Sequence, residues 1–563
     1  MQKVHHLSIF ILTPVYKYNT YYIEAFVEDL ESHDEGIERF KLINVMLPTS
    51  PFFATKVMPI LEANITTITT LELQSCDLNS NDISNVSKFV KKNKLLGVLN
   101  LSWNNLFGNE ENSSAKQLAK SMKKHPELSY VNLSNTGLGK NNEALKIILE
   151  GSKEINSLIL DDNTFDKEGI ALVTNMLKKK NTVAEFSLGS VGIGEGKKGK
   201  TKARMLRDTL EKNTSLEQIC LARNDLGSDE RVLSIVMSGI KESVSLSHID
   251  LSGNKIKKMS SIKLIAKYLA SNPALVELNL GYNKIPAKSA SILIKALEEN
   301  TTLEHLSLAG NNIANKNVPA IIDVLQNNTT LRSLDLKDNK IKSNTTGRDD
   351  LFKAICDTTS LDSIANNSNH TCCLTIAGCN YKGSNENELY KINALEDEGE
   401  KIRYKVVLAL CSLNKDLYNC QSFEDVPLEL MPKLLELIQL EIGYNGYGKE
   451  ITKRTVKKST INRLNNVYET IHQWPAFPSL FIRGPGKDCL TKTGKLKTKR
   501  GKRVAKVLDE DEAFPPPEGC RKKRRRWWMS SPEPVKPSRS SSRATNAVSY
   551  ADVENSEDES DMY

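Results

Sequence analysis

The sequence offers few of the residue patterns that mark a metal site, a disulfide framework or a catalytic centre. Its ten cysteines are scattered along 563 residues without a CxxC pair, unlike the cysteines of a disulfide-rich secreted module. The eight histidines occur in no HExxH or similar spacing. His370, Cys372, Cys373 and Cys379 lie close together in sequence, but their spacing fits no usual zinc pattern. We therefore expect reduced thiols in an intracellular compartment, no metal, no cofactor and no enzymatic activity.

Long hydrophobic runs are also missing. No apolar stretch is long enough to span a bilayer. The apolar run near the N-terminus is only about six residues long before Thr13-Pro14, shorter than the usual ~7–15 apolar residues of a signal peptide. A Tyr-rich sequence follows it instead of a cleavage site. These features predict a chain that is neither secreted nor membrane-bound.

The sequence does contain a repeated pattern, LxxLxLxxNxL. One of its best copies is Leu275-Val-Glu-Leu278-Asn-Leu280-Gly-Tyr-Asn283-Lys-Ile285. The copies follow one another at intervals of 27 to 33 residues. Fixed-period self-similarity of this length indicates a solenoid of stacked repeats. The second apolar position of each copy is occupied by Leu71, Leu99, Val131, Leu158, Phe186, Ile219, Ile249, Leu278, Leu306 and Leu334, with a worn copy predicted at Ile364.

The pattern also predicts the structure of each repeat. LxL is a short strand with alternate residues pointing inward, and the Asn that follows can satisfy backbone groups of neighbouring turns. Cys76 is an acceptable substitute for that Asn, whereas Thr136 and Val191 are expected to interrupt the ladder. Apolar residues at helical spacing complete the repeat. The predicted ladder consists of Asn104, Asn163, Asn224, Asn254, Asn283, Asn311 and Asn339.

A repeat of about 28 residues with a full helix resembles the ribonuclease-inhibitor type of leucine-rich repeat. The resemblance implies an α/β horseshoe, a curved solenoid with parallel strands on the concave face and helices on the convex face. We predict an N-terminal cap over residues 1–65, a solenoid of about 10–11 repeats over 66–380 and a helical C-terminal cap over 381–483, because open solenoid ends need covering. Residues 484–563 are predicted to form a disordered tail, basic and then acidic.

The tail contributes a net +5 of the chain's +8, from 18 basic and 13 acidic residues. Its two basic clusters match what nuclear-import adaptors recognise, and they could also contact RNA or DNA phosphates weakly. Ser531 and Ser556 are candidate phosphorylation sites that could modulate these clusters. The residues of the two clusters are Lys499, Arg500, Lys502, Arg503, Arg521, Lys522, Lys523, Arg524, Arg525 and Arg526.

One segment matches a nucleotide-binding motif. Gly194–Thr201 fits G-x-x-x-x-G-K-[ST], in which Lys200 would reach the terminal phosphate and Thr201 would bind magnesium. However, the motif requires a strand leading directly into its first glycine. The strand expected at Phe186–Leu188 is a repeat strand, and the repeat pattern continues after it through Val191 and Ile193 before Gly194 is reached. We interpret the segment as a basic loop insertion in a long repeat.

The remaining candidate for function is a protein-binding surface. Trp103 and Tyr282 are expected at the turn that leaves a strand, and Trp and Tyr dominate interaction hot spots. Asp250, Asn279 and Asp335 are expected on the concave face. We predict a non-enzymatic scaffold for protein partners of unknown identity, located in the nucleus or alternatively in the cytoplasm. An RNA-associated protein that contacts nucleic acid through its tail is the first alternative, and nucleotide binding at Gly194–Thr201 is the second.

Overall fold

A computed structural model describes most of the repeat region. The chain divides into two units, Met1–Lys495 and Leu496–Tyr563, and all described residues belong to the first. They are residues 5–10, 36–45, 47, 51–108, 113–151, 155–179, 182–341, 346–359, 361–376, 385–399, 401–402 and 404–405. Most of the predicted C-terminal cap and the whole predicted tail lie outside them.

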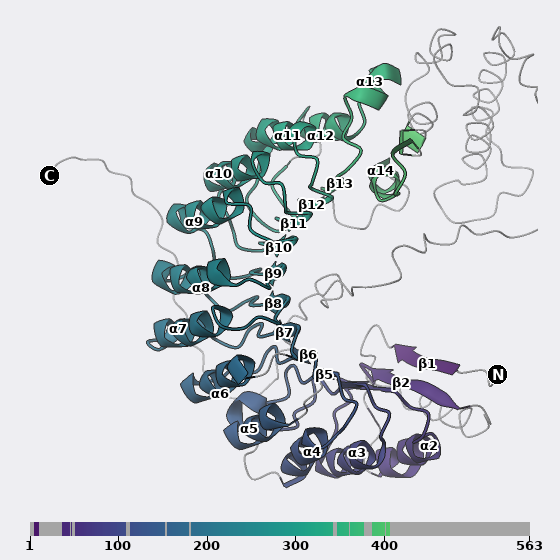
Figure 1. Ribbon diagram of the computed structural model, residues 1–563. Coiled ribbons are helices and arrows are strands. Elements are labelled where there is room, and N and C mark those ends of the chain that lie inside the picture. Colours follow the sequence, from purple (N-terminus) through teal and green to yellow (C-terminus); the bar gives the residue numbers. More distant parts are fainter. Residues whose placement is uncertain are drawn as a thin grey trace, which may run out of the picture. The chain divides into compact units, whose positions relative to one another are not determined.

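The described strands form one parallel sheet in the order of the sequence, from β1 to β13. Figure 1 shows the strands along the inner side of a curved array of repeats and the helices along its outer side. The strands are β1 (His5–Phe10), β2 (Ile37–Ile43), β3 (Thr70–Gln74), β4 (Val98–Asn100), β5 (Tyr130–Asn132), β6 (Ser157–Ile159), β7 (Glu185–Ser187), β8 (Gln218–Cys220), β9 (His248–Asp250), β10 (Glu277–Asn279), β11 (His305–Ser307), β12 (Ser333–Asp335) and β13 (Cys373–Thr375).

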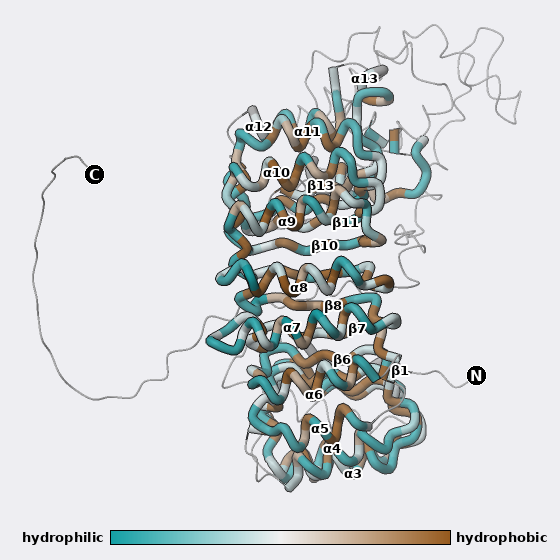
Figure 2. Tube along the Cα trace, turned by 60° about the vertical axis from the view of Figure 1, so that its left-hand side comes forward, coloured by the Kyte–Doolittle hydropathy of each residue, from teal (hydrophilic) through white to brown (hydrophobic). Residues whose placement is uncertain are grey.

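The helices alternate with the strands. They are η1 (Phe53–Val57), α2 (Met58–Ala63), α3 (Ser80–Lys92), α4 (Ser113–Lys123), η2 (Leu138–Lys140), α5 (Asn142–Glu150), α6 (Lys167–Lys179), α7 (Gly199–Leu210), α8 (Glu230–Glu242), α9 (Met259–Ala270), α10 (Ala287–Glu298), η3 (Asn315–Asn317), α11 (Val318–Asn327), α12 (Thr346–Ile355), α13 (Leu361–Asn366) and α14 (Asn385–Asn393). Apolar and polar residues alternate along these helices (Figure 2), because each helix turns one apolar stripe towards the strands.

The structure confirms the predicted register of the repeats. Leu278 lies opposite Ile249 on one side and Leu306 on the other, and the same pairing continues from Leu71 to Leu334 through the intervening marker residues. These residues form a continuous buried core between the sheet and the helices. The curved leucine-rich-repeat solenoid is therefore the observed architecture.

The worn copy predicted at Ile364 is wrong. Ile364 lies in helix α13, and the strand that pairs with β12 is β13, where Leu374 lies opposite Leu334. The interval between these two leucines contains both α12 and α13. The segment around Ile364 has apolar residues three apart, which fits a helix as well as a worn repeat.

At the other end, the sheet begins earlier than the repeat pattern does. Strand β1 pairs in parallel with β2, and Leu7 lies opposite Phe40. The short apolar run near the N-terminus is therefore a strand of the sheet. Strand β2 and the helical residues of η1 and α2 follow it within the predicted cap.

Candidate protein-binding surface

The ladder asparagines connect each repeat to the one before it. The amide nitrogen of Asn283 donates to the carbonyl of Leu251 at 2.9 Å and to that of Leu280 at 3.0 Å. Its Oδ1 accepts the N–H groups of Asn254 at 2.8 Å and Ile256 at 3.1 Å. Since buried backbone groups need partners, each asparagine fixes the path of the chain just after a strand.

The ladder continues across Thr136 and Val191, two of the three positions without asparagine. The hydroxyl of Thr136 donates to the carbonyl of Leu133 at 2.7 Å, and Asn163 of the next repeat accepts the N–H of Thr136 at 3.2 Å. Likewise, Asn224 accepts the N–H of Val191 at 3.1 Å. Thr136 thus keeps one side-chain donor and Val191 has none, but the backbone N–H groups at both positions stay paired.

The residue before each ladder position has a left-handed backbone. This conformation is unfavourable for residues other than glycine, and here the ladder and inter-repeat bonds impose it, as when the N–H of Tyr282 donates to the Ala309 carbonyl at 2.7 Å. We call these residues the exit row, because they lie where the chain leaves the strands. The exit row is Ser75, Trp103, Asn135, Asp162, Ser190, Arg223, Gly253, Tyr282, Gly310 and Asp338.

The exit row places its two aromatic side chains outside the core. Trp103 is 42% exposed and Tyr282 is 60% exposed. Val244 and Leu95 are the other large apolar side chains with high exposure among the described residues, and neither belongs to the exit row. The two aromatic anchor candidates therefore lie on the same register line of the repeats.

The side chain of Tyr282 extends along the exit row. Its hydroxyl donates to Oδ2 of Asp338, two repeats away, at 2.8 Å. The ring passes over Gly310, where a Cβ atom would collide with the ring carbons. Burial, the hydrogen bond to Asp338 and the charges of Asp338 and Asp335 raise the pKa of Tyr282 to about 12. The phenol is therefore a neutral, oriented group at physiological pH.

Arg223 repeats the same geometry nearer the middle of the array. Its Nη2 lies 3.2 Å from Oδ2 of Asp162, two repeats away and across Ser190. A Cβ atom on Gly253 would lie 2.8 Å from the Cγ of Arg223. In this part of the exit row, Arg223 and Tyr282 thus alternate with small residues, and each of the two long side chains is held by a carboxylate. Sequence reasoning missed Arg223, although its position before Asn224 would have identified it.

Asp250 and Asn279, the two other predicted site residues of β9 and β10, have buried side chains. They are only 5% and 8% exposed. Nδ2 of Asn279 donates to Oδ2 of Asp250 at 3.1 Å, and the two side chains accept the N–H groups of Ser252 and Gly281 at 2.7 and 2.9 Å. Burial raises the pKa of Asp250. The hydrogen bond between the two side chains connects the ends of β9 and β10.

Two further carboxylates lie near the ends of strands. Asp335 accepts the N–H of Lys337 at 3.0 Å, and burial raises its pKa. Asp161, which sequence reasoning did not select, accepts the hydroxyl of Ser187 and the N–H of Gly189, the latter at 2.6 Å. Burial raises the pKa of Asp161 to about 6.

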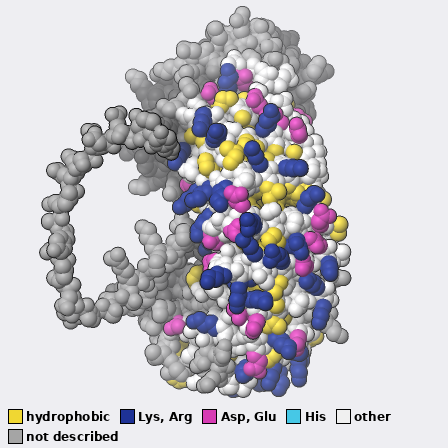
Figure 3. Space-filling view, turned by 90° about the vertical axis from the view of Figure 1, so that its left-hand side faces the viewer, with side chains coloured by type: hydrophobic (Ala, Val, Ile, Leu, Met, Phe, Trp, Pro, Cys, Tyr) yellow, Lys and Arg dark blue, Asp and Glu magenta, His cyan; other side chains and the backbone are white. Residues whose placement is uncertain are grey.

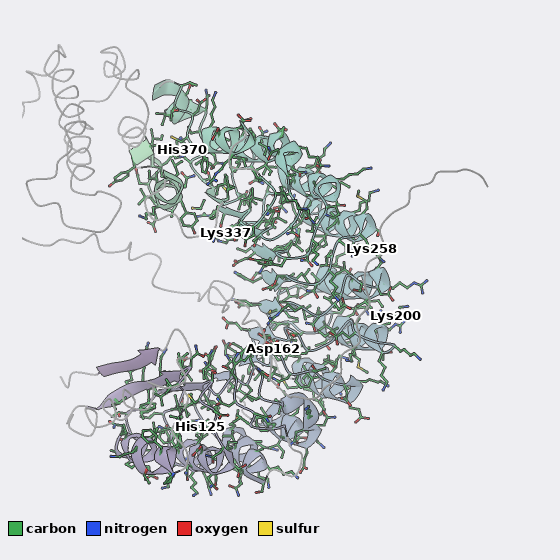
Figure 4. The ribbon with its side chains drawn as sticks, turned by 180° about the vertical axis from the view of Figure 1, so that it is seen from behind. His125, Asp162, Lys200, Lys258, Lys337 and His370 are labelled. Carbon is green, nitrogen blue, oxygen red and sulfur yellow. The ribbon has the colours of Figure 1, made fainter. Side chains whose placement is uncertain are left out.

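Figure 4 labels Asp162 and Lys337 at the strand layer, and Lys200 and Lys258 at the helix layer.

The geometry of the Gly194–Thr201 segment differs from that of a phosphate cradle. The N–H of Gly194 donates to the Asn224 carbonyl at 2.9 Å. Lys200 forms an ion pair with Asp229 at 3.2 Å. The buried lysine of this region is Lys202, two residues after the motif lysine Lys200. Its amino group donates to backbone carbonyls. The first glycine and the motif lysine are therefore engaged in contacts between repeats.

His370 and its neighbouring cysteines are arranged for packing. Nδ1 of His370 lies 3.1 Å from Nζ of the buried Lys405, and Nε2 lies 3.1 Å from the carbonyl of Ala365. Cys372 and Cys373 are buried thiols, and burial raises the pKa of Cys372. No group of three or more His, Cys, Asp or Glu residues in the described part of the chain is arranged to hold a metal ion.

The described helices include none that is long and apolar enough to cross a membrane. The two basic clusters of the tail, and the candidate phosphorylation sites Ser531 and Ser556, lie outside the described residues. Their roles remain predictions from the sequence.

Comparison with known proteins gives matches to repeat proteins. A family model described as Leucine Rich repeat matches residues 299–316 and 327–344. The chain is 28% identical over 226 residues to NACHT, LRR and PYD domains-containing protein 14 of Mus musculus, which covers 40% of this chain and 22% of that protein. For the Homo sapiens protein of the same name, the identity is 28% over 227 residues, with coverages of 40% and 20%. The chain thus matches about a fifth of the length of these relatives.

Solved structures give matches of lower similarity. The leucine-rich-repeat-containing protein LegL7 of Legionella pneumophila matches with a TM-score of 0.39 and 17% identity, over 64% of this chain and 98% of that one. The actin-binding site 2 of Leiomodin-1 matches with a TM-score of 0.23 and 18% identity, over 28% of this chain and 87% of that one.

Proposed function

We propose that this leucine-rich-repeat protein is a non-enzymatic scaffold that binds protein partners through the exit row. The observation that supports the proposal is the outward presentation of Trp103 and Tyr282 on one register line, 42% and 60% exposed. Proteins of this fold generally act by binding other proteins, although a fold alone does not determine a function.

The exit row meets the physical requirements of an interaction hot spot. Large aromatic side chains supply much contact area with few rotatable bonds, and tight interfaces concentrate their binding energy in such residues. The backbone of Tyr282 is fixed by its bond to the Ala309 carbonyl, and its hydroxyl by Asp338. Binding therefore costs little ordering entropy at this position, which increases affinity.

Affinity capture with matched variants tests this proposal. Partners recovered by the full chain at physiological salt should be lost when Trp103→Ala or Tyr282→Ala is introduced, since truncation of a hot spot costs at least about 2 kcal/mol, more than tenfold in affinity. Val244→Ala is the matched control, because Val244 is 79% exposed but lies outside the exit row. Equal recovery of the same partners by all the variants would refute the assignment to the exit row.

We further propose that the scaffold acts in the nucleus, on the basis of the two basic clusters of the tail. A fluorescent fusion of the full chain should accumulate in the nucleus. Neutral replacements of Lys499, Arg500, Lys502, Arg503 and Arg521–Arg526 should abolish that accumulation, because import adaptors read positive charge. A wild-type fusion that stays cytoplasmic would contradict the proposal.

A measurement of RNA binding distinguishes the scaffold from the alternative of an RNA-associated protein. Contacts made only by lysine and arginine to phosphates weaken steeply with salt, so the full chain should bind RNA weakly at physiological salt. Tight binding there that is lost in Trp527→Ala or Trp528→Ala would instead favour an RNA-associated protein, because aromatic side chains stack on unpaired bases.

A further inference from the structure

The charge of the segments that follow the strands changes along the array. The twelve residues after β6 (160–171) contain four acidic residues and one lysine, and those after β8 (221–232) contain three acidic residues and two arginines. The twelve residues after β9, β10 and β11 (251–262, 280–291 and 308–319) contain no acidic residue. We call their six lysines the lysine edge: Lys255, Lys257, Lys258, Lys284, Lys288 and Lys316.

The backbone places four of the six lysines at equivalent positions of adjacent repeats. The segments after β10 and β11 run side by side, with a parallel bridge between Pro286 and Asn312. The N–H of Asn312 donates to the Ile285 carbonyl at 3.0 Å, and the Asn312 side chain donates to the Lys284 carbonyl at 3.1 Å. Lys255 and Lys284 each follow a ladder asparagine directly, and Lys288 and Lys316 each lie five residues after one. Since neighbouring strands are about 4.8 Å apart, the two lysines of each pair lie on adjacent repeats.

Most of this positive charge is uncompensated. All six lysines are exposed. Lys255 pairs with Asp225 at 2.9 Å, and Lys258 with Glu230 at 3.5 Å. The remaining lysines, which are Lys257, Lys284, Lys288 and Lys316, take part in none of the ion pairs formed between described residues.

Two of these lysines lie at helix N-termini, where a positive charge does not stabilise the helix. Lys258 is the N-cap of α9 and Lys288 lies in the first turn of α10, and neither helix has an acidic residue in its first turn. Cations are disfavoured at a helix N-terminus, where the dipole is positive. By contrast, α8 begins with Asp229 and Glu230. On the outer helical face, basic and acidic side chains are interspersed (Figure 3).

We propose that the lysine edge binds an acidic segment of a partner protein. The inference rests on the proposed scaffold function and specifies the chemistry of its partner. An uncompensated row of cations attracts anions and accelerates their encounter with the protein. Its extent of three repeats, or roughly 10–15 Å, matches about four extended residues at ~3.3 Å each.

Neighbouring groups favour a short acidic peptide over a nucleic acid. The three segments that carry the lysine edge contain no arginine, which is the residue best suited to bidentate phosphate recognition. Asp250, Asp335 and Asp338 lie at the ends of the same group of strands or just after them. A long polyanion that extended beyond the lysine edge would meet the exposed carboxylate of Asp338, whereas a short acidic peptide would not.

Binding of a labelled acidic peptide tests the inference. The probe is a fluorescein-labelled twelve-residue peptide of alternating Asp and Glu, and anisotropy is measured at low and at physiological salt. All proteins compared are full chains in which the basic clusters of the tail are neutralised, so that the tail does not bind the probe. The edge variant carries Lys257→Gln, Lys284→Gln, Lys288→Gln and Lys316→Gln.

A control variant with the same change in charge shows whether position matters. It carries substitutions at four exposed lysines of the helical repeats outside the edge, Lys212→Gln, Lys263→Gln, Lys267→Gln and Lys295→Gln. We expect the edge variant to bind the peptide about tenfold more weakly, because four exposed ion pairs each contribute a fraction of that factor. The control should lose less than about twofold, and the difference should shrink at high salt.

Several outcomes would overturn the inference. These are an equal loss in the control variant, no binding of the peptide by the unsubstituted edge, or stronger edge-dependent binding of a twelve-nucleotide RNA than of the peptide. If partner capture still depends on Trp103 and Tyr282 in that case, the scaffold proposal stands and only the lysine edge has failed. Loss of that dependence would count against the scaffold proposal instead.

Discussion

Replacement of Leu278 by alanine is expected to lower the free energy of unfolding by about 2–5 kcal/mol. Leu278 is 2% exposed and lies between Ile249 and Leu306 in the buried row of strand residues. The substitution removes apolar contacts and leaves a cavity in a core that neighbouring repeats share. The effect should reach beyond one repeat, because each repeat is stabilised by its interfaces with its neighbours.

Chemical denaturation of the full chain, monitored by circular dichroism, measures this effect. Val244→Ala is the matched control, because Val244 is 79% exposed, and surface substitutions usually change stability by less than about 0.5 kcal/mol. An unchanged unfolding midpoint for Leu278→Ala would mean that Leu278 does not occupy the buried position of its repeat.

The sequence was sufficient to predict this register because the pattern is periodic. Leu278 and Leu306 belong to well-preserved copies 28 residues apart, and stacked repeats place equivalent positions opposite one another. The same reasoning failed at Ile364, because a local pattern cannot distinguish a worn strand from a short helix. Two helices lengthen that interval before Leu374 resumes the sheet.

The candidate surface was only partly accessible to sequence reasoning. Trp103 and Tyr282 were placed at the turn after a strand, which is where the structure has them. The burial of Asp250 and Asn279 was not predictable in the same way, because it depends on side chains contributed by neighbouring repeats. The pairing of Tyr282 with Asp338 across Gly310 also connects residues that are distant in sequence.

The lysine edge was present in the sequence but needed the strand ends to become visible. Counted over the whole chain, basic and acidic residues nearly balance, at 77 and 69. Only when the segments after each strand are aligned do three successive ones show lysines without acids. The charge pattern is therefore a property of the register, which places residues such as Lys284 and Lys316 on one edge.

Replacement of Asn283 by alanine should also destabilise the array, by about 1–3 kcal/mol. The substitution leaves the N–H groups of Asn254 and Ile256 without the Oδ1 acceptor, and the carbonyl of Leu251 without its donor. Buried backbone groups that lose their partners pay the full cost of desolvation. Asn327→Ala is the matched control, because Asn327 is exposed at the end of α11.

A threonine at this position should have an intermediate effect, because the chain already contains such a case. Thr136 keeps one donation, to the carbonyl three residues before it, and Asn283→Thr should keep the equivalent bond to Leu280. The threonine side chain is too short for its γ-oxygen to replace the hydrogen bonds that Asn283 makes with the preceding repeat. The denaturation midpoint is therefore expected to be highest for the wild type, lower for Asn283→Thr and lowest for Asn283→Ala. A threonine variant no more stable than the alanine variant would show that the cross-repeat bonds account for the whole contribution of the ladder.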